Sequence, residues 1–145
     1  MPVHRTRSEE ETIELGERLA GSLPSRQVVL LIGQLGAGKT TLAKGIVKGL
    51  GAAQPDEVSS PTFTLIHEYG SEGRVFHIDL YRLDTLAELA TLGLEDLFER
   101  DAIVLVEWGE RFPEILPPER TEIHIRAGAD EEREIEVRIL SPGSG

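Results

Sequence analysis

The amino-acid sequence predicts an α/β fold: a three-layer sandwich around a mainly parallel central sheet, with β-hairpins added to it. Two almost purely aliphatic runs, 27–32 and 102–106, are typical of strands that are covered on both faces, as strands of a parallel sheet are. Segments rich in β-branched and aromatic residues flank short polar turns within 62–80 and 121–140, and they predict the two hairpins.

A glycine-rich loop follows the first aliphatic run. Residues 33–40 read G-Q-L-G-A-G-K-T and match G-x-x-x-x-G-K-[ST] at every fixed position. The glycines allow backbone conformations in which successive N–H groups point at phosphate oxygens. Lys39 can then reach the β- and γ-phosphates, Thr40 can coordinate Mg²⁺, and the helix beginning near Lys39 directs its positive end at the same anion. The sequence therefore predicts a Walker A loop and a P-loop NTPase-like fold.

Composition limits the classes of function. A length of 145 residues predicts one domain, 1–145, with 141–145 as a frayed tail. The absence of cysteine excludes disulfides, thiolate metal sites and cysteine nucleophiles. A net charge of -11 opposes direct docking on RNA, and no apolar stretch reaches membrane-spanning length, so we expect a cytoplasmic protein with no membrane contact. Without asparagine there is no N-K-x-D guanine motif, which favours ATP as the nucleotide.

The first helix is predicted to begin at Ser8, which three glutamates follow in the pattern of a capping box. Pro24 is expected to end it. The acidic start is interpreted as a complement to the helix dipole, and contact with a nucleotide is the alternative.

Hydroxyl groups gather around a proline in the segment 58–64. Such a segment resembles a switch loop, in which a hydroxyl such as that of Thr62 approaches the γ-phosphate and the metal. The alternative is an ordinary turn rich in capping residues before a strand.

Two acids stand at the carboxyl ends of predicted strands, where open α/β sheets bind ligands. Asp79 follows V-F-H-I, and Glu107 follows I-V-L-V in the Walker B pattern. The purer aliphatic run favours Glu107 as the metal ligand and leaves Asp79 as the catalytic acid or as a carboxylate behind the metal ligands. The alternative is that one of them only pairs with Lys39 or an arginine.

The remaining segments carry less chemistry. Short helical stretches are expected at 85–92 and 94–98. The four histidines have no metal-ligand spacing and are interpreted as strand or surface residues: His4, His67, His77 and His124.

Four strings give the chain a resemblance to the TsaE (YjeE) family of small bacterial ATPases, which are required for making threonylcarbamoyladenosine on tRNA. They are G-A-G-K-T-T (36–41), S-P-T-F-T-L (60–65), H-I-D-L-Y-R (77–82) and L-V-E-W (105–108). The resemblance implies that Thr40 and Glu107 hold Mg²⁺ and that Asp79 lies against the nucleotide. It further implies that Glu9 and Arg133 flank the adenosine. With the Walker A and switch residues, the predicted nucleotide contacts are Glu9, Gly33, Gly36, Ala37, Gly38, Lys39, Thr40, Thr41, Thr62, Asp79, Trp108 and Arg133, and the predicted catalytic residues are Lys39, Asp79 and Glu107.

By the same resemblance, the partners are TsaD and TsaB, and tRNA is reached only through them. No arginine is obviously placed to act as an arginine finger, so the isolated protein is expected to hydrolyse ATP slowly. We hypothesise that residues 60–64 and Trp108 lie near the docking surface; the alternative for Trp108 is simple packing beneath the sheet edge. Two other functions stay open: a small-molecule kinase and an ATP-gated, non-catalytic interaction module.

Overall fold

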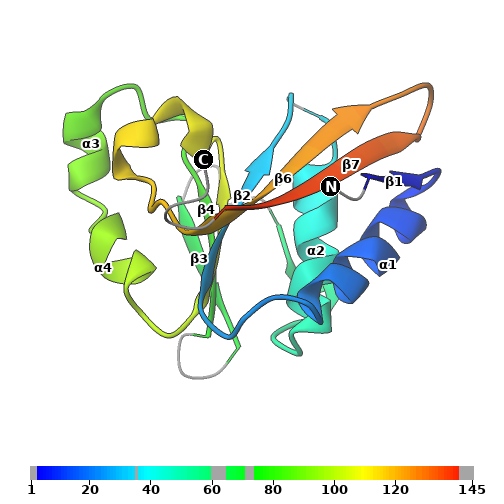
Figure 1. Ribbon diagram of the computed structural model, residues 1–145, viewed down its shortest axis with the longest axis horizontal. Coiled ribbons are helices and arrows are strands. Elements are labelled where there is room, and N and C mark those ends of the chain that lie inside the picture. Colours follow the sequence, from blue (N-terminus) through cyan, green and yellow to red (C-terminus); the bar gives the residue numbers. More distant parts are fainter. Residues whose placement is uncertain (1–2, 35, 60–64, 71–73, 141–145) are drawn as a thin grey trace.

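The computed structural model describes residues 3–34, 36–59, 65–70 and 74–140 and has a seven-stranded mixed sheet between two layers of helices (Figure 1). The strand order is β1-β7-β6-β2-β5-β4-β3. The four middle strands pair in parallel, and the outer strands pair antiparallel. The predicted fold class is thereby confirmed. The strands are β1 (Val3–Thr6), β2 (Gln27–Ile32), β3 (Ile66–Tyr69), β4 (Val75–Asp79), β5 (Ile103–Glu107), β6 (Arg120–Ala127) and β7 (Arg133–Leu140).

The helices form the two outer layers of the sandwich. α1 (Glu9–Ala20) and α2 (Lys39–Gly49) lie on one side of the sheet, and α3 (Leu86–Ala90) and α4 (Leu94–Phe98) lie on the other (Figure 1). Short 3₁₀ helices complete the described structure at Pro55–Glu57, Gly109–Arg111 and Pro113–Ile115.

Strand β2 is aliphatic throughout because it contributes to two hydrophobic cores. Val29 and Leu31 pack in the core beneath α1 and α2, whereas Val28 and Leu30 pack in the core on the α3 and α4 side. All four side chains are at most 5% exposed. Alternate side chains of a strand point to opposite faces, so a central strand covered on both faces needs no polar position.

Helices α1 and α2 approach closely at two glycines. A Cβ at Gly16 would lie 2.6 Å from the carbonyl oxygen of Leu42, and one at Gly45 would collide with the carbonyl oxygen of Ile13. Only glycine permits such backbone contact. The close packing places the first turn of α1 beside the glycine-rich loop that precedes α2.

Several boundaries differ from those that the sequence predicts. The first helix ends at Ala20, before Pro24, and α3 covers 86–90 rather than 85–92. Ser8 caps α1 as predicted by accepting the N–H of Glu11, but the Glu11 carboxylate accepts from the N–H of Arg7, so the expected capping box is incomplete.

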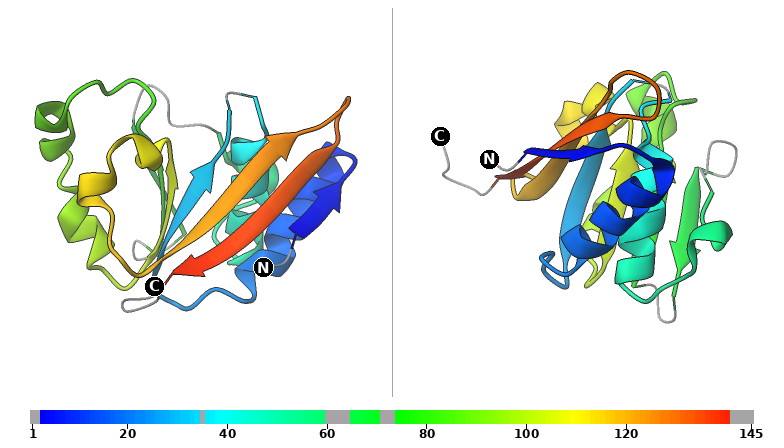
Figure 2. Two further views of the ribbon diagram at one scale, coloured as in Figure 1. Left: turned by 45° about the horizontal axis from the view of Figure 1, so that its top comes forward. Right: turned by 90° about the vertical axis from the view of Figure 1, so that its right-hand side faces the viewer.

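The sheet has one strand that the sequence analysis did not predict. β1 pairs antiparallel with β7, the last strand of the chain, at one edge of the sheet (Figure 2). On the opposite edge, β3 begins at Ile66, after Leu65 with its positive φ of 71°. The proposed switch residues 60–64, the hairpin residues 71–73 and the predicted tail 141–145 lie outside the described residues.

Candidate functional site

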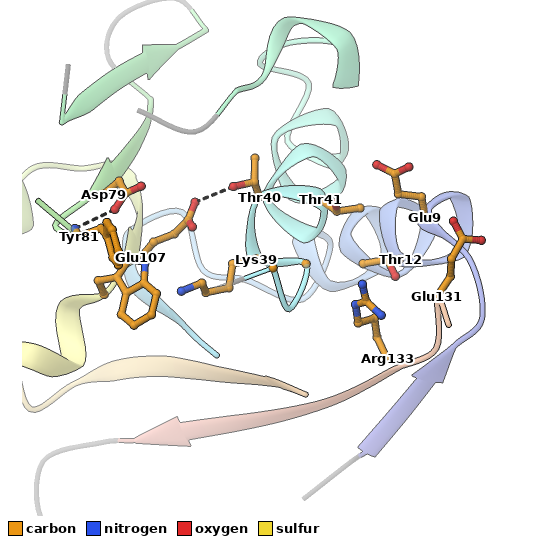
Figure 3. A pocket seen from close by; sticks show the side chains of 13 residues that line it. Glu9, Thr12, Lys39, Thr40, Thr41, Asp79, Tyr81, Glu107, Glu131 and Arg133 are labelled. Atoms are coloured by element: carbon orange, nitrogen blue, oxygen red, sulfur yellow. Dashed lines mark hydrogen bonds between the residues drawn. The ribbon is translucent and has the colours of Figure 1, made fainter. Parts of the chain in front are cut away.

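A cavity of about 530 Å³ opens over the glycine-rich loop, at the carboxyl ends of β2, β4 and β5 (Figure 3). It brings together ten of the predicted site residues and adds Thr12, Tyr81 and Glu131 to them. The lining residues are Glu9, Thr12, Gly36, Gly38, Lys39, Thr40, Thr41, Asp79, Tyr81, Glu107, Trp108, Glu131 and Arg133. This is the place where ligands bind in open α/β sheets.

The loop before α2 has the geometry of a phosphate cradle. Gly36 and Gly38 have φ angles of 81° and 105°, and Gly38 caps the N-terminus of α2. Such left-handed positions strain any residue with a Cβ. The N–H groups in the first turn of α2, which have no partner within the helix, and the positive end of the helix dipole therefore lie at the cavity, where they suit an anion.

Two predicted contact residues, Gly33 and Ala37, lie outside the cavity lining. A Cβ at Gly33 would stand 2.6 Å from the carbonyl oxygen of Ile125, and Ala37 is 2% exposed with its N–H donated to Gln34 O at 2.9 Å. These contacts fix the base of the loop. Thr62, a further predicted contact, falls among the residues that are not described.

Lys39 stands at the centre of the cavity and is 4% exposed. Its Nζ donates to Gly33 O at 2.9 Å and lies 3.4 Å from the centroid of the Trp108 ring. Burial lowers the pKa of Lys39, and nearby carboxylates, Glu107 first, act in the opposite direction. The ammonium group is thus held between a carbonyl dipole and an aromatic face, both of which favour a cation.

Glu107 meets the P-loop threonine directly. Thr40 Oγ1 donates to Glu107 Oε2 at 3.2 Å, and β5 is the immediate neighbour of β2 in the sheet. The same oxygen lies 2.6 Å from Nε2 of His77, which is completely buried. The sequence analysis missed this histidine. The available signal was its place two residues before Asp79, which puts both side chains on one face of β4.

Asp79 lies beside Glu107 but one strand farther from the P-loop. The two acids are register partners on β4 and β5, and each is 3% exposed. Asp79 Oδ1 accepts the N–H of Tyr81 at 2.9 Å, which orients the carboxylate. The described structure has no cluster of three or more protein ligands of the kind that cages a metal. Two carboxylates and a hydroxyl fit Mg²⁺, which keeps several waters and takes its other oxygens from phosphates.

The end of the cavity opposite the two acids is formed by the first helix and the last hairpin. Glu9 and Thr12 come from α1, and Glu131 and Arg133 come from the β6–β7 hairpin (Figure 3). Arg133 donates to Glu132 O at 2.7 Å, and its side chain lies against Gly38. Glu9 and Arg133 were predicted, but Thr12, Glu131 and Tyr81 were not. Thr12 and Glu131 lie in segments without a recognisable motif, whereas Tyr81 lies in the H-I-D-L-Y-R string, which was the available signal for it.

Trp108 and Tyr81 form an aromatic wall at the end of the cavity that holds the acids. Their ring centroids are 5.1 Å apart, and Tyr81 is 45% exposed. Trp108 has a positive φ of 66° and directs its ring toward Lys39. Its place in the cavity wall differs from simple packing beneath the sheet.

A third carboxylate lies near Lys39. Glu110 Oε1 is buried and has no hydrogen-bond partner in the part of the chain that the structure describes. Burial raises the pKa of Glu110, and a hydrogen bond from its own backbone N–H and the positive charge of Lys39 offset this only in part. The side chain therefore holds its charge at a cost to the folded state.

Replacing Glu110 by glutamine is expected to raise the melting temperature near neutral pH by about 2 °C. A raised pKa means that the folded state binds the proton more tightly, so wild-type stability is lost as the pH rises through the folded pKa. The stabilisation by Glu110→Gln should therefore grow as the pH rises above 4.5, the ordinary pKa of a glutamate, and thermal unfolding at a series of pH values measures this growth. Glu114→Gln, at an exposed site, serves as the control. A gain that is the same at every pH would contradict the argument.

The chain is similar to known proteins in sequence and in structure. The family model described as "Threonylcarbamoyl adenosine biosynthesis protein TsaE" matches residues 6–135. The tRNA threonylcarbamoyladenosine biosynthesis protein TsaE of Bacillus subtilis (strain 168) is 42% identical over 133 residues, which cover 90% of this chain and 81% of the relative. The TsaE protein of Treponema pallidum (strain Nichols) is 37% identical over 132 residues, 91% and 96% of the two chains.

The likeness extends to a solved structure. The crystal structure of Bacillus subtilis YdiB superposes with a TM-score of 0.77 and 35% identity, and the match covers 97% of this chain and 86% of that one. In the part of the chain that the structure describes, no helix is long and apolar enough to cross a membrane. The match of the family model over most of the chain and the two full-length relatives lead to one assignment: the chain belongs to the TsaE family.

Proposed function

We propose that this protein is a Mg²⁺-dependent subunit that binds and hydrolyses ATP, and that it supports threonylcarbamoyl transfer to tRNA adenosine by acting on a TsaB–TsaD complex in the cytoplasm. Membership of the TsaE family supports the pathway. The observation that carries the chemistry is a single cavity in which the phosphate loop faces two buried carboxylates, Asp79 and Glu107.

The phosphates would be held by Lys39 and by backbone N–H groups of the loop 36–41, with the exception of the Ala37 N–H, which is donated to Gln34 O. In the described structure Lys39 bonds to Gly33 O and contacts Trp108. A phosphate in the cradle offers a stronger, charged acceptor, so Nζ would turn toward it. The lysine would then supply one of the countercharges that phosphoryl transfer requires.

Thr40 and Glu107 are the residues that would hold Mg²⁺. Their side chains already meet at 3.2 Å: Glu107 ends β5, and Thr40 lies in the first turn of α2, the helix that follows the neighbouring strand β2. When bound, the ion neutralises negative charge on the phosphate oxygens. Asp79 lies beside this pair with its carboxylate held by the N–H of Tyr81, in a place to orient a water molecule and to accept its proton.

The adenosine would lie toward the other end of the cavity, between Glu9 and Arg133. Arg133 already lies against Gly38, so it forms a continuous wall with the phosphate loop. Glu9 is the first residue of α1. Because α1 packs against α2, Glu9 is held at a fixed position relative to the phosphate loop.

The cationic residues of the cavity support dependence on a partner. Among the described lining residues, only Lys39 and Arg133 carry positive charge, and Arg133 stands at the end away from the two acids. A countercharge supplied by a partner is worth roughly 10³ to 10⁵ in rate in related phosphoryl-transfer systems. The aromatic wall of Tyr81 and Trp108 adjoins the acids and is a suitable place for such a partner to approach.

The proposal is tested by steady-state release of phosphate from ATP, with the protein alone and with a TsaB–TsaD pair. We expect slow release alone and a stimulation of at least about 10³-fold with the partners. The partners should stimulate phosphate release by Trp108→Ala and Thr62→Ala less than release by wild type. Trp108→Phe keeps an aromatic face for Lys39 and should be stimulated more than Trp108→Ala. Equal rates of phosphate release with and without the partners would refute the dependence of hydrolysis on a partner. A phosphorylated acceptor in place of free phosphate would indicate a kinase, and no phosphate in either mixture would indicate a non-catalytic module.

A further inference from the structure

We infer that His77 is a positioning residue of the metal site, one that fixes the Glu107 carboxylate in the orientation needed to hold Mg²⁺. The inference rests on the proposed function and adds to it a residue that does not line the cavity. Its basis is one contact: Nε2 of the fully buried imidazole lies 2.6 Å from Oε2 of Glu107.

The strand register explains why the imidazole reaches this carboxylate. Asp79 pairs with Glu107 across β4 and β5, and His77 lies two residues before Asp79 on the same face. The imidazole therefore approaches Glu107 from the interior, below the two acids. Thr40 approaches the same oxygen from the side of the P-loop. One carboxylate oxygen is thus held from two directions, and Oε1 makes no hydrogen bond to any described residue, so it is left for the ion or its water.

The other ring nitrogen indicates which proton the imidazole carries. Nδ1 of His77 is buried and has no hydrogen-bond partner among the described residues. Since a carboxylate accepts at Nε2, the hydrogen lies on Nε2, and a neutral ring leaves Nδ1 as an unfilled acceptor.

The surroundings argue against a role in packing alone. Apart from the two acids, the neighbours on the same face of β4 and β5 are aliphatic, among them Val75, Ile103 and Leu105. An aliphatic side chain would fill this space without an unsatisfied nitrogen. An imidazole here is accounted for by its hydrogen bond to Glu107, because carboxylates that bind metals depend on such outer partners for orientation.

The test compares the Mg²⁺ requirement for nucleotide binding at equilibrium, measured with a fluorescent ATP analogue. His77→Leu removes the donor, and His77→Gln places an amide N–H near the position of Nε2. We expect His77→Leu to raise the Mg²⁺ concentration for half-maximal binding by about tenfold or more, and His77→Gln to stay close to wild type. Binding without Mg²⁺ should be the same in all three. His124→Leu is the control, because it also removes a His–Glu hydrogen bond but lies outside the cavity.

A second measurement needs neither nucleotide nor metal. In the free protein, the Nε2 proton of His77 should exchange slowly with water and be visible by NMR, and Glu107→Ala should abolish its signal. If His77→Leu does not fold, His77→Asn takes its place, since the shorter amide does not reach Glu107; it should need more Mg²⁺ than His77→Gln.

The outcomes separate the two proposals. An unchanged Mg²⁺ requirement in His77→Leu or His77→Asn, together with a raised one in Glu107→Gln, overturns the role of His77 and leaves the proposed function intact. Nucleotide binding that ignores Mg²⁺ in wild type and in Glu107→Gln overturns both.

Discussion

Replacing Lys39 by alanine is expected to reduce ATP turnover by about 10²- to 10³-fold, measured as phosphate release in the presence of saturating TsaB–TsaD. The lysine is the only cationic lining residue near the two acids among the described residues, and its Nζ is already confined by Gly33 O and Trp108. A buried ammonium group loses little solvation when a phosphate approaches, so its removal deprives the transferred group of a strong countercharge.

Matched variants separate charge from packing. Lys39→Met keeps most of the aliphatic stem but removes the charge that lies over Trp108, and it should be nearly as inactive as Lys39→Ala. Lys48→Ala, on the same helix but paired with Glu17 at 2.8 Å, should retain wild-type turnover. Thr40→Ala should also be inactive, and Thr40→Ser should recover activity because it restores the hydroxyl. Wild-type turnover in Lys39→Ala would refute the assignment of the phosphate site.

Glu107→Ala and Asp79→Ala are expected to fail in different ways. Glu107 bonds to Thr40, so its loss should remove the Mg²⁺ dependence of nucleotide affinity, with binding in excess Mg²⁺ about tenfold weaker or more. Asp79 lies farther from the P-loop strand, so Asp79→Ala should bind MgATP normally and turn over about 10²-fold or more slowly. Titration of Mg²⁺ against nucleotide affinity, followed by turnover at saturation, measures both effects.

The controls for this pair preserve local hydrogen bonds. Asp79→Asn retains an acceptor for the Tyr81 N–H, so a low turnover in this variant reports the lost charge rather than a displaced loop. Glu114→Ala removes an exposed carboxylate and should change neither quantity. An equal loss of Mg²⁺ dependence in Asp79→Ala and Glu107→Ala would show that both acids hold the ion.

The central strand and the phosphate loop could be predicted from sequence because their causes are local. A strand covered on both faces must be aliphatic, and left-handed turns at Gly36 and Gly38 require glycine, so both leave a pattern in consecutive residues. The β6–β7 hairpin alternates apolar and polar residues for the same kind of reason.

The parts that escaped prediction depend on contacts distant in sequence. β1 is four residues long, and its partner is the last strand, so neither its length nor its pattern distinguishes it from a loop. In the sequence, nothing distinguishes His77 from the other residues of its strand. Its contact with Glu107 follows only from the register of β4 and β5. Thr12 and Glu131 line the same cavity only because α1 packs against α2 and the β6–β7 hairpin lies at the same end of the cavity as α1.

The strand order also bears on how the chain is made. β2 carries the phosphate loop, yet it pairs with β5 and β6, and the cavity is closed by Arg133 at the start of β7. During synthesis the loop therefore leaves the ribosome long before the strands that hold it in place. Pairings so distant in sequence form slowly, and a nucleotide has no complete pocket to enter until almost the whole chain has emerged. Nucleotide binding is consequently a property of the finished protein, and bound nucleotide stabilises only chains that have completed their sheet.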